Sequence, residues 1–172
     1  MKKLLVVVDM QNDFVTGALG TKEAVSIVPN VVAKVLDAIE TGTDVIFTKD
    51  THGENYLSTQ EGRNLPIMHC IKGTDGWELV PELYKYSVTH KVIEKPVFGS
   101  RLLGQEVLNG HYTDVELIGL CTDICVISNA MIVKSVDPEI IVSVDSSCCA
   151  GVTPESHENA LNAMRMCQIN IY

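Results

Sequence analysis

Short, continuous apolar runs are the feature that most constrains the fold of this sequence. Residues 4–8 read LLVVV, with no alternating polar positions. Such runs are typical of strands buried on both faces of a parallel sheet. Five further runs predict strands, at 44–48, 87–95, 115–120, 139–145 and 168–172, and the run at 87–95 is the less apolar one expected nearer an edge.

Segments with helical periodicity lie between these runs. Residues 24–40 carry apolar positions at helical spacing and end before Gly42, a common stop signal. Residues 124–136 predict a mostly buried helix, and 154–167 predict an amphipathic helix with Pro154 in its first turn. This alternation predicts a three-layer α/β/α fold with a mostly parallel, roughly six-stranded, doubly wound sheet.

The size and charge of the chain exclude several classes of protein. Its 172 residues suit one domain, expected over residues 1–172. A formal net charge of −9 without clustered Lys or Arg argues against a nucleic-acid partner. No apolar run reaches the roughly 20 residues of a membrane helix, and the run at 4–8 is too short for a signal peptide. We therefore expect a cytoplasmic protein, with no membrane partner, whose six cysteines stay reduced.

One connection between predicted strands is unusually long and irregular. It includes residues 49–77, which we expect to be an ordered loop because it holds Trp77 and other apolar residues. Its Asp50, His52 and His69 suit a divalent metal with mixed nitrogen and oxygen ligands, although a polar surface loop explains them too. Further oxygen donors in the loop are Glu54 and Glu61, while His90, His111 and His157 lack clustered partners and are interpreted as structural or exposed.

Reactive side chains follow three of the predicted strands. The first strand ends at Asp9, the third ends at Lys95, and the fourth precedes the segment CTDIC at 121–125. Ligands of doubly wound sheets bind beyond the carboxyl ends of the strands, so we expect these groups to converge. We place Cys125 in the first turn of the next helix, where the dipole and Lys95 favour a thiolate. The N-cap residues considered are Thr122 and Asp123.

These residues allow more than one interpretation. Asp9 can take the thiol proton of Cys125 as a general acid–base, and backbone N–H groups of the turn can hold an oxyanion. A purely structural interpretation is equally possible. Asp9 can cap a turn, the Lys95 side chain can be exposed to solvent at the end of its strand, and Cys125 can be a small hydrophobic residue of the core. A further hypothesis is a redox or metal-binding protein that uses Cys121 and Cys125.

Several segments resemble the isochorismatase-like cysteine hydrolases, in order along nearly the whole chain. The specific ones are VVVDMQNDF and GLCTDICV, supported by KDTH, LPIMHCIKGTDGWEL, EKPVFGS and DSSCCAGVTPESHENAL. The resemblance implies a triad of Asp9, Lys95 and Cys125 that cleaves an amide through a thioester. It also implies oxyanion donors at the backbone N–H groups of Cys121 and Cys125, and a cis peptide bond before Cys121.

Within this family, the sequence is most similar to the nicotinamidases, whose metal is held by an Asp-x-His pair and a later His. Asp50, His52 and His69 match this set, and Glu61 competes with His52 as the ligand used in some relatives. The resemblance implies one divalent metal ion, with zinc as the first expectation and iron or manganese as alternatives. The implied substrate-binding residues are Phe14 and Phe98.

The leading hypothesis is therefore a metal-containing cysteine amidohydrolase that converts nicotinamide into nicotinate and ammonia. The segment KPVFGS at residues 95–100 departs from the Tyr-Ser-Ala-Phe stretch of many nicotinamidases, which leaves the substrate open. The alternative keeps the triad and acts on another small amide, ureido or carbamoyl compound. The expected partner is a small-molecule amide, and a homo-oligomer is expected by analogy alone.

Overall fold

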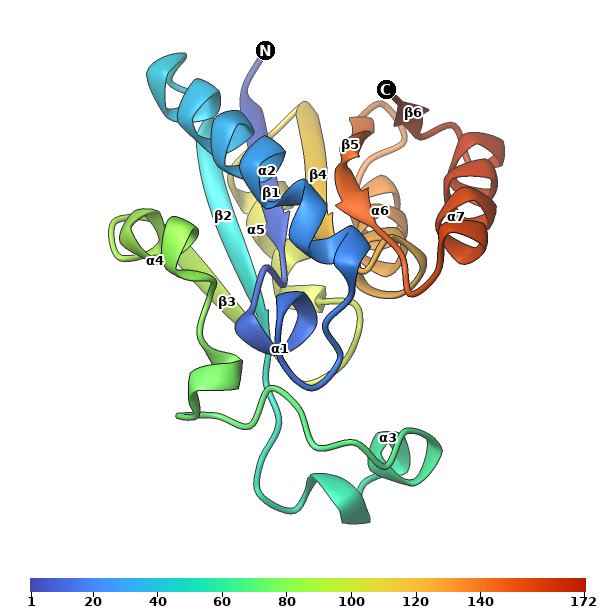
Figure 1. The fold of residues 1–172 in the computed structure, drawn as a ribbon. Coiled ribbons are helices and arrows are strands. Elements are labelled where there is room, and N and C mark those ends of the chain that lie inside the picture. The colour runs from blue at the N-terminus through green and yellow to red at the C-terminus, as the bar shows by residue number, and fades with distance from the viewer.

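The computed structural model describes all of residues 1–172 and contains one six-stranded sheet. The strand order is β3-β2-β1-β4-β5-β6, and every neighbouring pair is parallel (Figure 1). This confirms the predicted doubly wound α/β/α fold and the edge position of the third strand. The strands are β1 (Lys3–Val8), β2 (Asp44–Asp50), β3 (Lys91–Lys95), β4 (Asp114–Leu120), β5 (Ile141–Ala150) and β6 (Asn170–Ile171).

Helices cover both faces of the sheet (Figure 1). The α-helices are α1 (Asn12–Val15), α2 (Lys22–Glu40), α3 (Gln60–Asn64), α4 (Pro81–Ser87), α5 (Arg101–Asn109), α6 (Ile127–Lys134) and α7 (Pro154–Met166). Two 3₁₀ turns, Tyr56–Ser58 and Asp75–Trp77, and one π-helical turn, Thr122–Val126, complete the set. None of the helices combines the length and apolarity that a membrane span requires.

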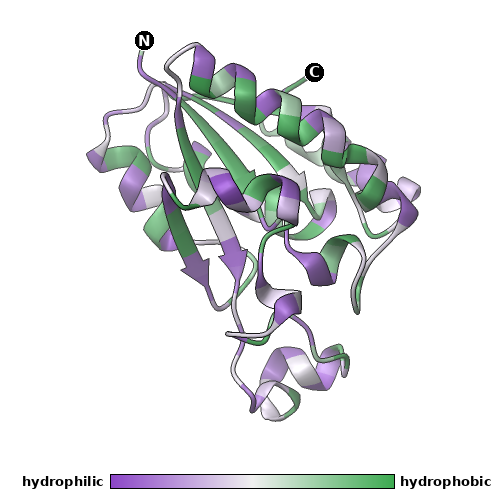
Figure 2. Ribbon diagram, turned by 60° about the vertical axis from the view of Figure 1, so that its left-hand side comes forward, coloured by the Kyte–Doolittle hydropathy of each residue, from purple (hydrophilic) through white to green (hydrophobic).

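Strand β1 is buried on both faces, as its continuous apolar sequence predicts. Leu4 and Val6 pack in the cluster formed with α5, α6 and α7, whereas Leu5 and Val7 pack in the cluster formed with α1, α2 and α4. Figure 2 shows the central strands as largely hydrophobic and the segment around α3 as mostly hydrophilic. The two hydrophobic clusters thus cover the two faces of the sheet. The polar segment around α3 lies beyond the carboxyl ends of the strands.

The structure corrects two local predictions and adds a helix that was not predicted. The helix expected over 124–136 begins as a π-helical turn and ends as α6 at Lys134. Strand β5 continues past Asp145 to Ala150, because a register shift lets its last residues pair with the end of β4. Helix α5 lies where no element was predicted. Its nine residues are few for a periodicity argument, and the Ser100 side chain caps it by accepting the Leu103 N–H.

Gly119 in β4 is a position that only glycine fills at low cost. Its φ is +114°, and a Cβ there would lie 2.1 Å from the carbonyl oxygen of Val8. Gly119→Ala is therefore expected to lower the free energy of unfolding by about 3 kcal/mol or more, measured by chemical denaturation. Gly42→Ala is the matched control: its φ is +73° with open space around it, so its expected loss is about 1 kcal/mol. Similar losses in both variants would contradict the clash.

Candidate active site

The predicted site residues meet where the strand order reverses, between β1 and β4. Asp9 follows β1, and the segment 121–125 follows β4. Lys95 ends β3 and pairs in register with Asp50, the last residue of β2. The carboxyl ends of four neighbouring strands therefore deliver these groups to one place, the usual ligand site of a doubly wound sheet.

The three residues predicted as a triad lie in contact and are fully or almost fully buried. Lys95 Nζ lies 2.6 Å from Asp9 Oδ2 and donates to Cys125 Sγ at 3.4 Å. The exposed fractions of Asp9, Lys95 and Cys125 are 0%, 1% and 4%. Although burial disfavours the ammonium, the negative groups around it raise the pKa of Lys95 above its ordinary value. Lys95 thus carries a positive charge between a carboxylate and a thiol.

Asp9 is held in an unusual backbone conformation. Its φ is +47°, in the left-handed region, and its N–H donates to Thr48. The Thr48 hydroxyl in turn donates to Asp9 Oδ1 at 2.6 Å. Oδ2 is the oxygen that pairs with Lys95 Nζ, at 2.6 Å. Burial, against the opposing charge of Lys95, raises the pKa of Asp9 above its ordinary value, which favours proton uptake there.

The resting state expected for Cys125 needs correction. Burial, together with the nearby Asp9 charge, raises the pKa of the Cys125 thiol well above its ordinary value, and Lys95 opposes this shift without overcoming it. The sequence argument weighed the helix dipole and Lys95 but not the complete desolvation of the sulfur. The thiol is therefore protonated at rest and needs a base before it can attack.

The turn between β4 and α6 holds the expected cis peptide bond, between Leu120 and Cys121. The N-cap prediction was wrong, because Cys121 occupies that position and no side chain caps the turn. Asp123 instead accepts the N–H of Val152, at 3.1 Å for Oδ1. Thr122 shares a hydrogen bond with His157, so His157 has a partner that the sequence did not reveal. Both side chains are engaged by the segment around the start of α7.

Asp50, His52, Glu61 and His69 converge into one group whose ligand atoms all lie within 4.8 Å of one another. His52 Nε2 lies 2.9 Å from Asp50 Oδ2 and 3.6 Å from Glu61 Oε1. His69 Nε2 lies 3.6 Å and 3.8 Å from the same two oxygens. His52 and Glu61 therefore do not exclude each other, and Glu54 lies outside the group and is exposed.

The long loop is ordered around this group. Asp50 ends β2, and a parallel bridge between His52 and Ile71 brings His69 alongside. The Nδ1 of His69 lies 2.8 Å from the Ile67 carbonyl, which leaves Nε2 directed at the carboxylates. Two imidazoles, two carboxylates and an orienting second contact form a ligand set that could hold zinc or a related divalent ion.

Asp50 connects this group to the buried lysine. Its Oδ2 faces the two histidines, while its Oδ1 lies 3.5 Å from Lys95 Nζ. Burial opposes ionisation, but the two histidines and Lys95 hold the pKa of Asp50 well below its ordinary value. Asp50 is therefore a carboxylate, as a metal ligand must be.

A cavity of about 260 Å³ opens beside Cys125. Its walls are mostly apolar, and Phe14 and Phe98 are among them, as placed by the resemblance. Asp50, Glu61 and His69 line it on the side of the proposed metal group. The other lining residues are Leu19, Thr21, Ala24, Leu65, Leu120, Cys121, Ile124, Gly151 and Val152.

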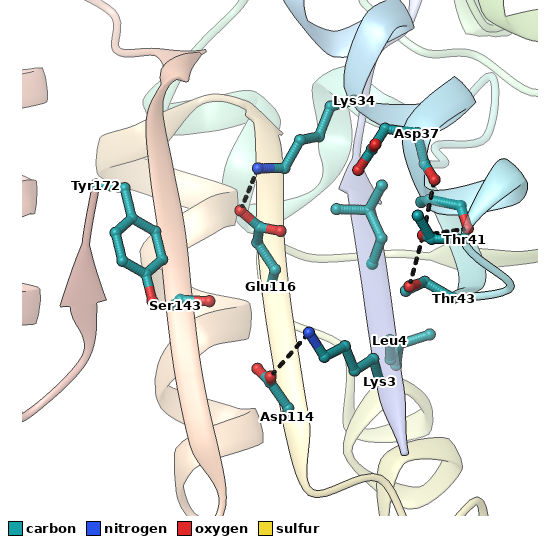
Figure 3. A pocket seen from close by; sticks show the side chains of 12 residues that line it. Lys3, Leu4, Lys34, Asp37, Thr41, Thr43, Asp114, Glu116, Ser143 and Tyr172 are labelled. Atoms are coloured by element: carbon teal, nitrogen blue, oxygen red, sulfur yellow. Dashed lines mark hydrogen bonds and ion pairs between the residues drawn. The ribbon is translucent and has the colours of Figure 1, made fainter. Parts of the chain in front are cut away.

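A second cavity, of about 510 Å³, lies at the amino ends of β1, β4 and β5 (Figure 3). Its two lysines are paired with acidic side chains. Lys34 Nζ lies 2.7 Å from Glu116 and 3.0 Å from Asp145, and Lys3 lies 4.0 Å from Asp114. It contains no cysteine or histidine, so we place the chemistry at the smaller cavity.

Sequence reasoning missed several supporting residues. The fully buried Gln11 side chain accepts the Asp50 N–H and donates to the carbonyls of Asp50 and Trp77, which ties β1 to the long loop. The fully buried Asn129 donates to the carbonyls of Cys125 and Phe98. Two features of the sequence could have indicated these residues. Gln11 lies within the DMQNDF segment, and Asn129 lies one helical turn after Cys125. All six cysteines are free.

Comparison with known proteins gives a consistent result. The isochorismatase domain matches residues 3–171. The solved nicotinamidase PncA from Bacillus subtilis is 28% identical, with a TM-score of 0.87 and 99% of each chain covered. The pyrazinamidase of Pyrococcus horikoshii, solved in complex with zinc, is 28% identical, with a TM-score of 0.86 and coverage of 100% of this chain and 99% of that one.

One relative shows why activity must be argued from the site. A protein of Arabidopsis thaliana described as a probable inactive nicotinamidase is 31% identical over 170 residues, covering 89% of this chain and 83% of that protein. In the present chain, the Asp, Lys and Cys expected of the family are all in place and in contact. The fold and the match over nearly its whole length show that this chain belongs to the isochorismatase family and is a hydrolase that acts on amide bonds.

Proposed function

We propose that this protein hydrolyses nicotinamide to nicotinate and ammonia through a thioester on Cys125. The observation that carries the proposal is the position of Lys95 Nζ, 2.6 Å from Asp9 Oδ2 and 3.4 Å from Cys125 Sγ, next to a cavity that a group of metal-type ligands lines. The similarity to a nicotinamidase and to a zinc-bound pyrazinamidase supports the same substrate class.

The cavity suits a small, neutral amide. Its volume of about 260 Å³ is small for a ligand site, and its walls are mostly apolar. No Lys or Arg lines it, whereas Asp50 and Glu61 do. An anionic substrate, such as an N-carbamoyl amino acid, therefore finds no side-chain counter-charge there. This observation favours nicotinamide and pyrazinamide over the ureido and carbamoyl alternatives.

The first half of the reaction forms the thioester. Asp9 Oδ2 takes the thiol proton of Cys125, and Lys95 stabilises the thiolate that results. The sulfur attacks the amide carbon, so an S–C bond forms and the carbonyl π electrons move to the oxygen. The backbone N–H groups of Cys121 and Cys125 donate to that oxyanion. When the oxyanion collapses, the C–N bond breaks, and Asp9 returns its proton to the leaving nitrogen as ammonia forms.

The second half releases the acid. Asp9, now a carboxylate again, accepts a proton from a water molecule that attacks the thioester carbon. The same N–H groups hold the second oxyanion, and the C–S bond breaks to give nicotinic acid, which releases its carboxyl proton to solvent and leaves as nicotinate. The proton held by Asp9 returns to the sulfur of Cys125, so each turnover consumes one water and restores the resting thiol.

A divalent metal ion fits the group formed by Asp50, His52, Glu61 and His69, because their two imidazole nitrogens and two carboxylates are a donor set that zinc, iron or manganese accepts. When bound, such an ion supplies a Lewis-acid contact for the ring nitrogen of the substrate and so orients the ring. Asp50 also contacts Lys95, and this contact links the metal-ligand group to the three residues proposed for the chemistry.

An ammonia-release assay with a panel of amides tests the proposal. Metal-replete protein should hydrolyse nicotinamide and pyrazinamide, and it should hydrolyse benzamide, which lacks a ring nitrogen, roughly 100-fold or more slowly. An N-carbamoyl amino acid should release no ammonia above background. A clear preference for the ureido or carbamoyl compound would overturn the nicotinamide assignment while leaving the amidase chemistry in place.

Two glutamates of the long loop give a matched test of the metal group. Glu61→Gln should weaken metal binding at least roughly tenfold, because it removes a charged ligand. Glu54→Gln, seven residues earlier and exposed, should bind metal as the wild type does. Metal retained after dialysis, measured by elemental analysis, reports the difference. Equal retention in both variants would show that Glu61 is not a ligand.

A further inference from the structure

We propose that Thr122 and His157 are positioning residues for the turn that carries the oxyanion donors. The inference rests on the proposed attack by Cys125, but it does not depend on which amide is the substrate. The observation behind it is a hydrogen bond of 2.7 Å between Thr122 Oγ1 and His157 Nδ1, which joins the turn after β4 to helix α7.

The Thr122 end of this hydrogen bond is buried. Thr122 has no exposed surface, and His157 is the one hydrogen-bond partner of its side chain. His157 lies in the first turns of α7, next to Gly151, and a Cβ on Gly151 would lie 2.8 Å from the backbone nitrogen of His157. Glycine therefore allows the start of α7 to approach the segment that leads into it.

A second bond joins the same two segments. Asp123 Oδ1 accepts the N–H of Val152, two residues before α7, at 3.1 Å. Consecutive side chains of the turn are thus both held by the region 151–157. Val152 and Gly151 line the smaller cavity, so the held region reaches the cavity wall. The turn and the start of α7 form one supported unit.

The position of Thr122 in the chain explains why its hydrogen bond matters for the oxyanion donors. Thr122 directly follows Cys121 and precedes Cys125 by three residues, so it lies between the two proposed N–H donors. A shift of its backbone would displace both donors from the carbonyl oxygen. Displacements of about 1 Å at such sites can cost on the order of 100-fold in rate. The metal group lies on another segment, between Asp50 and His69, so it does not depend on this hydrogen bond.

The experiment compares four single variants of the metal-replete protein. Thr122→Val keeps the shape and removes the hydroxyl, whereas Thr122→Ser keeps the hydroxyl. His157→Phe removes the hydrogen bond, whereas His157→Asn places an amide near the Nδ1 position. The measurements are kcat and KM for nicotinamide, well below the melting temperature of each variant, and the melting temperature itself.

The expected results separate positioning from general stability. Thr122→Val and His157→Phe should each lower kcat roughly 10- to 50-fold with KM nearly unchanged. Thr122→Ser and His157→Asn should stay within about threefold of the wild type, and the Thr122→Val/His157→Phe double variant should be no worse than either single one. A lower melting temperature with unchanged kcat, a Thr122→Ser variant as slow as Thr122→Val, or multiplicative losses in the double variant would overturn the inference.

Failure of the proposed function looks different. If the wild type releases ammonia from another amide but not from nicotinamide, the substrate assignment fails, and the same variants are compared on that other amide. If the wild type hydrolyses no amide at all, the Cys125 mechanism and this inference fall together. Normal turnover of nicotinamide by Thr122→Val refutes the inference alone.

Discussion

Cys125→Ala is expected to lower kcat/KM for nicotinamide by about 10⁴-fold or more, because no other group can form the thioester. Cys125 Sγ is the sulfur within hydrogen-bonding distance of Lys95 Nζ. Loss of one buried sulfur should lower the free energy of unfolding by only about 1 kcal/mol, so the variant should remain folded. An ammonia-release assay and a thermal melt measure the two quantities.

Cys121→Ala is the matched control for this substitution. The role proposed for Cys121 belongs to its backbone N–H, which alanine keeps, so kcat/KM should stay within about threefold of the wild type. Comparable losses in Cys121→Ala and Cys125→Ala would contradict the single-nucleophile account. They would instead favour the hypothesis that the two thiols act as a redox or metal-binding pair.

Asp9→Asn is expected to lower kcat roughly 10³-fold or more, because an amide cannot take the proton of the Cys125 thiol. Asparagine keeps the size of the side chain and an oxygen that can accept from the Thr48 hydroxyl. The exposed Asp37→Asn serves as the control for loss of one carboxylate and should be fully active. A wild-type rate for Asp9→Asn, measured on protein shown to be folded by circular dichroism, would remove Asp9 from the mechanism.

The same carboxylate predicts the direction of the pH dependence. Burial, against the opposing charge of Lys95, raises the pKa of Asp9 above its ordinary value. As the pH falls through that raised pKa, Asp9 becomes protonated and can no longer accept the thiol proton. The value of kcat/KM should therefore decline on the acid side at a higher pH than an ordinary aspartate would give. An acid limb confined to about pH 4 or below would contradict this.

Much of the fold could be predicted from the sequence because each strand carries a local signal. The run LLVVV at residues 4–8 marks a strand buried on both faces, and β1 has that position. Helix α5 escaped prediction because its amphipathic pattern is short. The extension of β5 to Ala150 escaped because it depends on pairing with the end of β4, which is a tertiary fact.

The candidate site also combines residues that the sequence indicates with contacts that depend on tertiary structure. Asp9, Lys95 and Cys125 stand at strand ends, so topology alone brings them together once a parallel sheet is assumed. The bond between Thr122 and His157 joins residues 35 positions apart and has no local signature. The raised pKa of Cys125 likewise depends on the burial of its sulfur, which is a property of the folded chain and has no local signal in the sequence.

Partitioning of the acyl group with hydroxylamine tests the central claim, a nicotinoyl thioester on Cys125, most directly. Nicotinamide and methyl nicotinate have different leaving groups but would form the same thioester. At one hydroxylamine concentration, both should give nicotinohydroxamate and nicotinate in the same ratio, and Cys125→Ala should form neither product. A ratio that changes with the leaving group, or nicotinate produced without any hydroxamate, would contradict the thioester.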